Sequence, residues 1–451
     1  MISAGVFLIL MCACGKEKIK ENNSSVYNTV TVEKKDVAIK TVSVTGEASQ
    51  TPLALQNYNG AEITYYSPNE PSQETKNKLA AFSKAHNCNV KIAVGTGDVR
   101  KDLSQAQDAG IFYDIVESSN ENFANTLSMD IYEPLDSLID IKDYFDPAVS
   151  ENCGLSQSVS SRFTIEDKVY AVGSAQSVDY YVIYYNKYLF DKAGLGDPYS
   201  LWTGGRWSFL AFEFMNTVTS YASGTAFLQL PELSEWFNLK ANDTIRFSEG
   251  TFKNDFYSEQ TLLSAEGYQQ LIYGDKPMSI PKSGKNSFKN GKAYSAIGKF
   301  SDYSALCDQI QKSEAFDEDL LNFGIVPLPD DINPSGSQSA STVRSYAAMK
   351  GSANPSAAPC YALFESRIED QTDEKSAVAA GISDYLKNSF NLNGYVPQLE
   401  FVNSEEGVGI SDILNSAGME IRDGVSYTTA LASRFSAAEY VINSSLQNKN
   451  D

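Results

Sequence analysis

Few residues in this sequence have the types and spacing that catalysis requires. The chain has a single histidine, His86, which follows a predicted helix and is typical of a surface residue. No serine stands in a G-x-S-x-G motif, and the sequence has neither a phosphate-binding glycine loop nor a cluster with metal-ligand spacing. The 57 acidic residues could supply a carboxylate pair for glycoside hydrolysis, but no local motif selects one pair. The sequence therefore predicts no catalytic residues, no cofactor and no metal.

Polar side chains that follow predicted strands suit a different chemistry, hydrogen bonding to a small polar ligand. They are Asn69, Glu70, Ser118, Asn120 and Glu121. In parallel α/β sheets, ligands bind beyond the carboxyl ends of the strands, so we predict that these residues face a binding site. Capping of the next helix is the alternative role of such residues, and the sequence leaves it open.

The elements that would position these side chains alternate along the chain. Alternating apolar and polar residues predict strands over 62–67, 89–95 and 113–119, and the segments between and after them predict helices over 74–87, 98–110 and 121–130. Asp98 is placed to cap the second helix and Gly110 to end it. Strands that alternate with helices indicate βαβ units and a largely parallel sheet.

Charge and composition exclude one class of partner. The formal net charge is −21, and because residues 15–57 carry a net charge of +1, residues 58–451 carry about −22. Binding to nucleic acid needs basic patches, so a chain this acidic is not expected to bind it. A length of 451 residues, 42% of them hydrophobic, is enough for more than one hydrophobic unit.

Four cysteines lie outside the N-terminal segment, at Cys88, Cys153, Cys307 and Cys360. They are widely spaced and form no C-x-x-C motif, which argues against a metal site. We expect buried free thiols, and a single disulfide bond remains the alternative for a protein outside the cell.

The first residues resemble the signal of a bacterial lipoprotein. The uncharged apolar run from Ile2 to Cys14 is shorter than the roughly 20 residues that span a bilayer. It matches the apolar core of an export signal. Ala13 and Gly15 flank Cys14 as in a lipobox, whereas Cys12 and the lack of basic residues at the start depart from that pattern. An ordinary cleaved signal and an uncleaved anchor are the alternatives.

This resemblance divides the N-terminal part of the chain. Residues 1–14 would be a signal that ends at a lipidated Cys14. Residues 15–57 are rich in Ser, Thr, Asn, Lys and Glu, which predicts a flexible tether. An alternating stretch within the tether could instead pair as a short hairpin.

Motifs along most of the remaining chain resemble one family of binding proteins. The stretch 168–212 has a short apolar strand, then Y-N-K, L-F, a glycine, a proline-containing turn and a tryptophan before a helix. SFKNGKAYSAIGKF at 287–300, FGIVPLPDD at 323–331 and the segment 345–365 follow in order, and GYVP stands at 394–397. In order and spacing, these motifs resemble family 1 bacterial extracellular solute-binding proteins, which include maltose-binding protein. The resemblance covers about 60–440.

The resemblance implies an α/β fold of the periplasmic-binding-protein type II class, with two discontinuous lobes joined by a hinge of crossing strands. Lobe 1 would comprise 58–176 plus 343–400, and lobe 2 would comprise 177–342 plus 401–451. The chain would cross between the lobes near Ser174–Asp179, near Thr342–Tyr346 and near Phe401.

The resemblance also assigns residues to a cleft between the lobes. Asp179 stands where a ligand-contacting carboxylate is expected, and Phe300 stands where the family often has a tryptophan that faces the cleft. Arg344, in the second crossing, could bind a carboxylate, a phosphate or a hydroxyl group, or could form an ion pair of the hinge. Trp236 and Tyr346 could provide aromatic platforms for a sugar ring. For Asp179 and Phe300, a solvated strand end and core packing are the alternative roles.

The function that the resemblance implies is that of a substrate-binding lipoprotein of a carbohydrate-type ABC importer. We expect a monomer on the extracellular face of the cell membrane, anchored through Cys14, in a Gram-positive organism. It would capture a mono- or oligosaccharide, or a similar small solute, and deliver it to the permease subunits. A secreted carbohydrate-active enzyme and a surface sensor or adhesion lipoprotein with the same fold are the alternatives.

Overall fold

The computed structural model describes residues 53–127, 129–145, 154–219, 225–280, 286–312, 322–329, 332, 338–367, 377–403 and 407–446. The predicted signal at 1–14 with Cys14, the tether up to residue 52, and Cys153 lie outside these ranges. Residues 53–57, which we assigned to the end of the tether, pack on the folded part. Leu53 is fully buried, and its backbone N–H donates a hydrogen bond of 3.1 Å to the hydroxyl group of Tyr144.

The first strands and helices form in the predicted order. They are β1 (Glu62–Ser67), α1 (Gln73–Ala85), β2 (Asn89–Val94), α2 (Val99–Asp108), β3 (Ile115–Ser119) and the short α3 (Ala124–Leu127). Strand β1 pairs in parallel with β2 on one side and with β3 on the other. The side chains of Ser72 and Asp98 accept backbone N–H groups at the starts of α1 and α2, which explains where these helices begin.

The sheet extends through strands from later parts of the sequence. These are β6 (Ala171–Val172), β7 (Val178–Asn186), β8 (Ala226–Gln229), β11 (Ala293–Lys299), β12 (Phe323–Pro327) and β13 (Ala340–Ala347). The strand order is β2-β1-β3-β13-β7-β11-β8, with β12 paired to β7 and β6 paired to β13. The prediction of a largely parallel sheet holds for β1, β2 and β3 and for the β8–β11 pair, whereas β13, β7 and β12 pair antiparallel.

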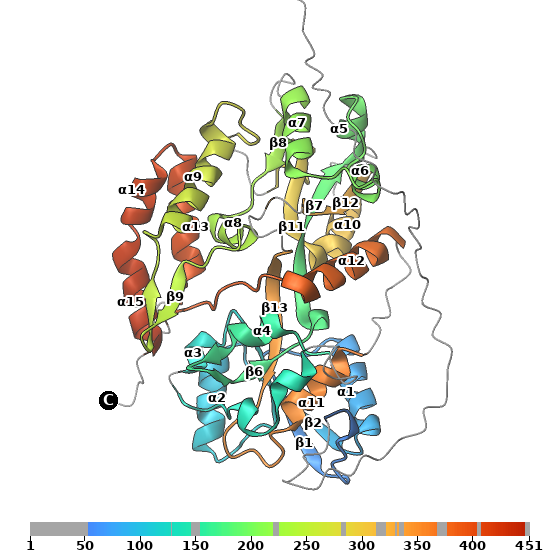
Figure 1. The fold of residues 1–451 in the computed structure, drawn as a ribbon, viewed down its shortest axis with the longest axis vertical. Coiled ribbons are helices and arrows are strands. Elements are labelled where there is room, and N and C mark those ends of the chain that lie inside the picture. Colours follow the sequence, from blue (N-terminus) through green and yellow to red (C-terminus); the bar gives the residue numbers. More distant parts are fainter. Residues whose placement is uncertain are drawn as a thin grey trace, which may run out of the picture. The chain divides into compact units, whose positions relative to one another are not determined.

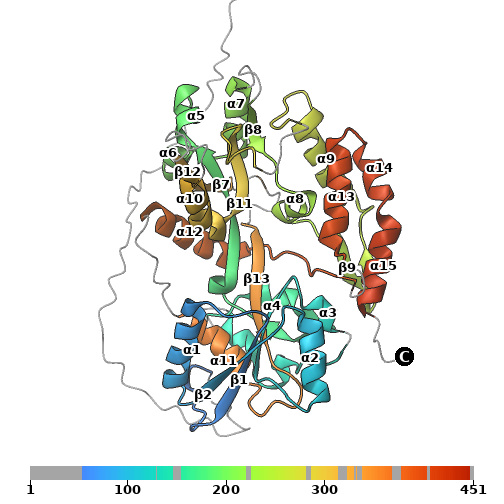
Figure 2. The same ribbon diagram turned by 180° about the vertical axis from the view of Figure 1, so that it is seen from behind.

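Strand β13 joins the two parts of this sheet. Residues 340–343 pair with β7, and residues 344–347 pair with β3. In both views, β13 runs from the strands β7 and β11 toward β1 and β2 (Figures 1 and 2). A single strand thus places residues that are distant in sequence next to the carboxyl end of β3.

The remaining elements surround the sheet. The helices are α4 (Gln157–Arg162), α5 (Lys187–Lys192), α6 (Pro198–Thr203), α7 (Phe209–Thr219), α8 (Leu233–Leu239), α9 (Glu259–Tyr273), α10 (Tyr303–Lys312), α11 (Ala357–Glu365), α12 (Ala377–Asn393), α13 (Ile410–Arg422), α14 (Tyr427–Ala432) and α15 (Phe435–Leu446). Two short hairpins are formed by β4 (Thr164–Ile165) with β5 (Lys168–Val169) and by β9 (Ile245–Ser248) with β10 (Thr251–Asn254). Helices α9, α13, α14 and α15 lie side by side (Figures 1 and 2).

His86 is buried, so the prediction of a surface histidine is wrong. Its side chain is only 5% exposed, and its Nδ1 atom lies 2.8 Å from the backbone carbonyl oxygen of Gln56. The thiol of Cys360 lies 3.6 Å from the same nitrogen. Residues 53–58 fold back over the end of α1 and cover the imidazole. The hydrophobic periodicity of α1 does not indicate this contact, so it did not predict the burial of His86.

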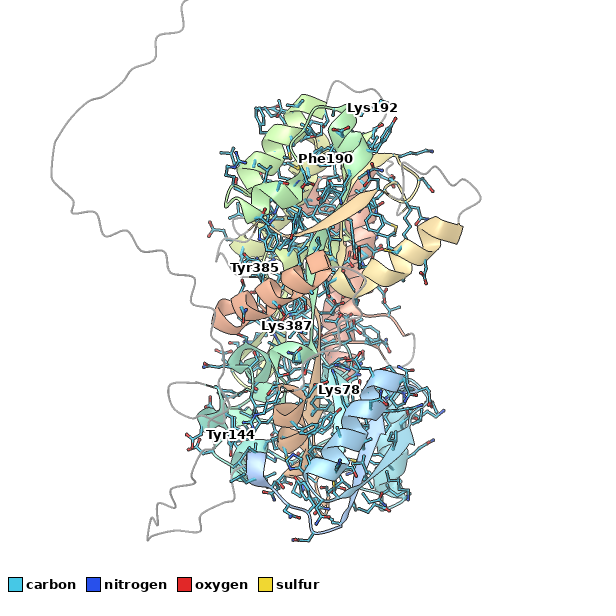
Figure 3. All side chains as sticks on the ribbon, turned by 90° about the vertical axis from the view of Figure 1, so that its right-hand side faces the viewer. Lys78, Tyr144, Phe190, Lys192, Tyr385 and Lys387 are labelled. Atoms are coloured by element: carbon cyan, nitrogen blue, oxygen red, sulfur yellow. The ribbon has the colours of Figure 1, made fainter. Side chains whose placement is uncertain are left out.

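A buried ion pair ties the middle of β13 to α11. The carboxylate of Glu365, 1% exposed, accepts hydrogen bonds from Arg344 at 3.1 Å, from the hydroxyl of Tyr346 at 2.9 Å and from the hydroxyl of Ser177 at 2.9 Å. Lys78 of α1, which is labelled in Figure 3, approaches the same carboxylate at 3.9 Å. Arg344 therefore forms an ion pair with Glu365 of α11, and its contact with a ligand stays a prediction.

Two further predictions concern thiols and membrane spans. Cys88, Cys307 and Cys360, the cysteines in the described part of the chain, are all free, as expected, although Cys88 and Cys307 are only partly buried. Within the same part of the chain, every helix is too short or too polar to cross a bilayer.

Candidate functional site

A pocket of about 380 Å³ lies beyond the carboxyl end of β3, and we call it the central pocket. It is bounded by β7, β11, β13, α8, the start of α13 and the extended segment 394–403 between α12 and α13, which we call the connecting segment. It is lined by Asn120, Glu121, Tyr181, Glu232, Ser234, Glu235, Asn238, Lys299, Ser341, Gln398, Glu400, Val402, Gly409, Ser411 and Asp412. Its volume falls within the range of small-molecule sites.

Three neighbouring strands supply one wall of the central pocket. Tyr181 of β7 is paired in register with Lys299 at the end of β11, and β13 contributes Ser341 next to them. Burial raises the pKa of Tyr181, and the carboxylate of Glu235 raises it further, so the phenol keeps its proton. The ammonium group of Lys299 donates a hydrogen bond of 3.2 Å to the hydroxyl of Thr342.

Asn120 connects three of the segments that form the pocket. Its side-chain oxygen accepts the backbone N–H of Val343 at 2.9 Å, and its own N–H donates to the carbonyl of Val343 at 3.3 Å. Its carbonyl oxygen accepts the backbone N–H of Glu400 at 2.7 Å. Hydrogen bonds to the main chain therefore hold the end of β3 against both β13 and the connecting segment.

Carboxyl groups dominate the other walls. They belong to Glu121, Glu232, Glu235, Glu400 and Asp412, whereas Lys299 is the one basic residue among the lining residues described above. Burial raises the pKa of Glu400 to about 7, and the carboxylates of Asp412 and Glu121 contribute in the same direction. Hydrogen bonds from the backbone N–H and the hydroxyl of Ser411, at 2.8 and 2.6 Å, oppose that shift.

The sequence of α8 presents its acidic residues to the pocket. Glu235 accepts the backbone N–H of Glu232 at 3.1 Å, as in a capping box, and Glu232 accepts a hydrogen bond from the side chain of Asn415 on α13. Residues 232, 235 and 238 line the pocket, whereas Trp236 and Phe237 are buried in the core.

Ser341 lines the central pocket with a hydroxyl group that no other described residue satisfies. The residue is 6% exposed, and no hydrogen-bond partner for its Oγ atom is found in the described part of the chain. Buried polar groups are usually paired, because an unpaired buried hydroxyl is unfavourable. The wall of the pocket therefore offers an unused hydrogen-bonding group.

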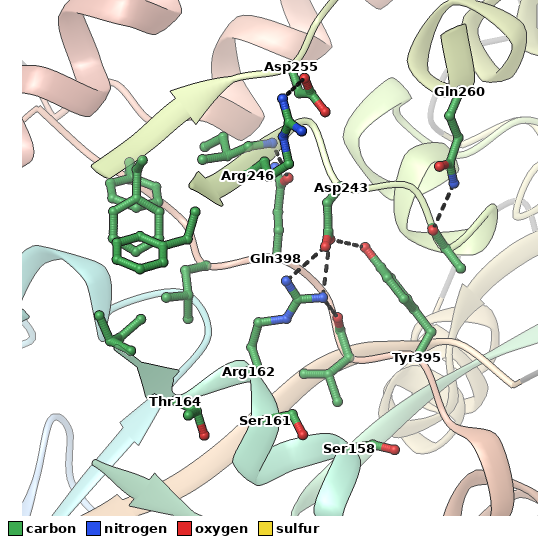
Figure 4. A pocket seen from close by; sticks show the side chains of 18 of the residues that line it. Ser158, Ser161, Arg162, Thr164, Asp243, Arg246, Asp255, Gln260, Tyr395 and Gln398 are labelled. Carbon is green, nitrogen blue, oxygen red and sulfur yellow. Dashed lines mark hydrogen bonds and ion pairs between the residues drawn. The ribbon is translucent and has the colours of Figure 1, made fainter. Parts of the chain in front are cut away.

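A second pocket, of about 640 Å³, lies on the other side of the connecting segment and shares Gln398 with the central pocket. Arg162 of α4 forms a two-point ion pair with Asp243, with N–O distances of 3.0 and 3.1 Å (Figure 4). The hydroxyl of Tyr395 donates to Asp243 at 2.7 Å, and Arg162 donates to the carbonyl of Val396 at 2.6 Å. The central charged groups of this pocket are thus satisfied by one another.

A third cavity, of about 830 Å³, adjoins the central pocket and shares Glu121 and Val402 with it. Its lining includes Asp98 and Arg100 from the start of α2. Arg100 donates hydrogen bonds to the backbone carbonyl groups of Asn125 and Ser445. The connecting segment therefore borders three cavities. The central pocket shares lining residues with each of the other two.

Of the strand-end residues that we predicted, the structure brings Asn120 and Glu121 into the central pocket. Ser118 is 1% exposed, and its hydroxyl donates to the side chain of Asn122 at 2.8 Å, which is a local turn contact. Glu70 is exposed and pairs with Lys76. Asn69 lies in the loop after β1, close to Gly97. For these last three predicted residues, contact with a ligand stays a prediction.

Asp179 and Phe300, predicted from distant motifs, lie close together at the edge of the β7–β11 pair. Asp179 accepts hydrogen bonds from the backbone N–H of Ser301 at 3.1 Å and from its hydroxyl at 2.7 Å, so it holds the turn that begins at Phe300. Phe300 is partly buried against the core. Lys299, the residue before Phe300, reaches the central pocket.

Trp236 and Tyr346 lie in the core in this structure and not on the pocket wall. Trp236 is 2% exposed, and its indole N–H donates to the carbonyl of Ser264 at 2.8 Å. Tyr346 is fully buried beside Glu365. The predicted aromatic platform therefore has no geometric support from these two rings, and their role in binding stays a prediction.

Sequence reasoning missed most of the acidic residues of the pocket. Glu232 follows the end of strand β8, as Asn120 follows the end of β3. The rule that selected Asn120 could therefore have selected Glu232 as well. Glu400 and Asp412 reach the pocket only because the connecting segment crosses the carboxyl end of β3. No local pattern in the sequence marks that crossing.

The thiol–imidazole pair at Cys360 and His86 does not form a nucleophilic site. Burial raises the pKa of Cys360 to about 12, so the thiol keeps its proton at neutral pH. Among the described residues, no group of three or more His, Cys, Asp or Glu side chains could hold a metal ion.

Comparisons with known proteins agree on the fold. The structure resembles the sugar-binding protein MalE of Xanthomonas citri with a TM-score of 0.60 and 14% identity, covering 85% of this chain and 97% of that one. It also resembles an extracellular solute-binding protein of Staphylococcus aureus solved with maltose, with a TM-score of 0.58 and 13% identity over 85% of this chain and 98% of that one. For the lacto-N-biose-binding protein of an ABC transporter of Bifidobacterium longum, the TM-score is 0.57 and the identity 15%, over 86% and 99%.

At these identities, the likeness shows the two-lobed type II solute-binding fold, as the sequence resemblance implied. None of the curated protein sequences compared with the chain matches it. The sequence model of one family, described as bacterial extracellular solute-binding protein, matches residues 67–359, which is more than half of the chain. The chain therefore belongs to the family of bacterial extracellular solute-binding proteins.

Proposed function

We propose that this protein is the substrate-binding subunit of an ABC importer and that it captures a carbohydrate in the central pocket. The observation that carries the proposal is the position of that pocket, at the junction of β3, β13 and the connecting segment. Residues from all three segments line the central pocket. Motion of the two predicted lobes relative to each other would therefore open or close this pocket. The names of structural relatives that bind maltose and lacto-N-biose support a sugar as the ligand.

The lobes in this proposal keep the boundaries that the sequence predicts. Lobe 1 comprises 58–176 plus 343–400, and lobe 2 comprises 177–342 plus 401–451. The pairing of β13 with β7 and with β3 supports a crossing within residues 340–347. Closure of two lobes over a ligand is a hinge motion of binding proteins.

The same proposal includes an anchor and a membrane partner. Cys14 carries the lipid, residues 15–52 tether the folded part to the outer face of the membrane, and the closed form delivers its solute to the permease subunits. We propose no chemical reaction, because the chain belongs to a family of solute-binding proteins.

A ligand screen tests the binding step. Mono- and oligosaccharides are added to the purified protein, and the melting temperature is measured. A ligand at 100 times its Kd stabilises the folded state by about 2.7 kcal/mol. The best ligand is then titrated calorimetrically into the wild type, into Glu235→Gln in the pocket and into Glu213→Gln, an exposed position on α7. We expect weaker binding only for Glu235→Gln.

Two results would contradict the proposal. One is a screen in which no carbohydrate shifts the melting temperature. The other is hydrolysis of chromogenic glycosides that is lost when a pair of pocket carboxylates is changed to amides, which would favour the enzyme alternative. Small-angle scattering adds a test of closure, since the radius of gyration should fall when the ligand binds.

A further inference from the structure

One ion pair in the second pocket crosses the boundary between the two proposed lobes. Arg162 ends α4, and the next residue, Phe163, packs edge-to-face on Phe123 of lobe 1, with 5.0 Å between the ring centroids. Asp243 lies between α8 and β9, in lobe 2. The two N–O distances of 3.0 and 3.1 Å therefore join the lobes through a charged pair (Figure 4).

The guanidinium group of Arg162 fits into a socket with three sides. Besides the Asp243 carboxylate, it contacts the carbonyl oxygen of Val396 at 2.6 Å and lies 5.7 Å from the centroid of the Tyr395 ring. The hydroxyl of Tyr395 donates to the same carboxylate at 2.7 Å. A planar guanidinium group bound on two edges and one face has a fixed orientation, so the socket defines one arrangement of the lobes.

The connecting segment is hydrogen-bonded to both lobes beside this socket. The side-chain oxygen of Gln398 accepts the backbone N–H groups of Thr244 at 2.7 Å and Ile245 at 3.1 Å, in lobe 2. The backbone N–H of Glu400 donates to the carbonyl of Asn120, in lobe 1, at 2.7 Å. A short stretch of chain that is bound to both lobes can act as the pivot of their relative motion.

The ion pair and the central pocket lie on opposite faces of that pivot. Glu400 and Val402 line the central pocket, whereas Leu399 and Phe401 line the second pocket, as expected for an extended chain whose side chains alternate. Two bodies that approach each other on one side of a pivot separate on the other side. Closure of the lobes over the central pocket should therefore draw Arg162 away from its partner.

We propose that the Arg162–Asp243 ion pair is a latch that stabilises the open arrangement of the lobes and thereby sets the affinity for the solute. This inference rests on the proposed function and adds a regulation of the same site. A solute that binds the closed form must break the latch first, and the apparent Kd rises as the fraction of molecules able to close falls.

Asp243→Asn tests the latch, because it removes one charge and keeps the shape of the side chain. The ligand is the best carbohydrate from the thermal screen, titrated calorimetrically. We expect the variant to bind it about three- to ten-fold tighter than the wild type does. Tyr395→Phe removes one hydrogen bond to Asp243 and should act in the same direction with a smaller effect, so it serves as a second test if Asp243→Asn does not fold.

Two further variants separate the latch from a general loss of structure. In the charge-swapped protein, Arg162→Asp with Asp243→Arg, the Kd should return toward the wild-type value. Asp255→Asn is the matched control, since Asp255 borders the same pocket but pairs with Arg246, in its own lobe, at 3.5 Å. This control should leave the Kd unchanged. Melting temperatures of all variants without ligand show which of them lose stability.

The outcomes separate the two proposals. If the wild type binds a sugar and Asp243→Asn binds it equally or more weakly, the latch is refuted and the proposed function stands. A gain in affinity that Asp255→Asn shares in full would refute the latch as well, because that pair does not cross between lobes. If no sugar binds the wild type, the proposed function fails and the latch fails with it.

Discussion

Replacing Glu400 with glutamine should stabilise the folded protein at neutral and alkaline pH. The folded state raises the pKa of this carboxyl group from 4.5 to about 7, chiefly through burial, with Asp412 and Glu121 adding to the effect. Glutamine resembles the protonated acid and has no charge to desolvate. Its amide oxygen can accept the backbone N–H of Ser411, and its amide nitrogen can donate to the hydroxyl of the same residue, so both contacts are kept in altered form.

The sign and the size of the effect follow from the two pKa values. Between pH 4.5 and about 7 the unfolded chain ionises at Glu400 while the folded chain retains its proton, so the stability of the wild type falls as the pH rises. Each unit of difference corresponds to about 1.4 kcal/mol. The advantage of Glu400→Gln should therefore grow from about 1 kcal/mol at pH 5 to about 3 kcal/mol at pH 8.

Urea unfolding at pH 5, 6.5 and 8, followed by the fluorescence of the three tryptophans, measures the difference. Taking the difference between variants cancels the titration of all other groups. Glu213→Gln, at an exposed position on α7, is the matched control. A difference for Glu400→Gln that stays constant from pH 5 to pH 8 would refute the assignment of a raised pKa to this residue.

Three further predictions concern other parts of the chain. Cys14→Ser should release the protein from the membrane or leave it unprocessed, whereas Cys12→Ser should change little. Cell fractionation and mass spectrometry of the N-terminus measure both effects. Acylation of both variants would reject the lipobox. Asp243→Asn, which weakens a two-point ion pair, should lower the free energy of unfolding by about 1.5–3 kcal/mol, whereas Glu249→Gln in an exposed pair should cost less than about 1 kcal/mol. Asp179→Ala should lower the melting temperature modestly, since it removes the acceptor for the turn after β11 at a cost of about 1 kcal/mol. It should also weaken ligand binding by roughly 1.5–3 kcal/mol, and calorimetry that finds wild-type affinity would remove this residue from the site.

The parts of the fold that could be predicted are those set by local chemistry. The helix beginning after Asp98 was predicted because a side chain close in sequence caps it, and strand β1 was predicted from alternation within six residues. The direction of β13 could not be predicted in this way. Its pairing depends on segments more than 150 residues away, β7 and β3, and no short pattern records that choice.

The residues of the candidate site likewise include some that local sequence predicts and others that it does not. Asn120 and Glu121 were predicted because they follow the end of a strand. The same rule would also have predicted Glu232. Trp236 was chosen for its ring, but the residue is buried in the core, where its indole N–H donates to the carbonyl of Ser264. Glu400 was missed because its place depends on one hydrogen bond to the backbone at the end of β3.

The connecting segment offers a way to build an optical reporter from this protein. Gln398, Glu400 and Val402 border the central pocket, whereas Val396, Leu399 and Phe401 border the cavity behind it. A dye attached through a cysteine at the exposed position of Arg246, which lines that second cavity, would therefore be separated from the ligand by the connecting segment. Because the same short stretch of chain forms both walls, any shift of the main chain that accompanies occupancy would alter the dye's surroundings. The wall shared by these cavities would then convert solute binding into a fluorescence signal.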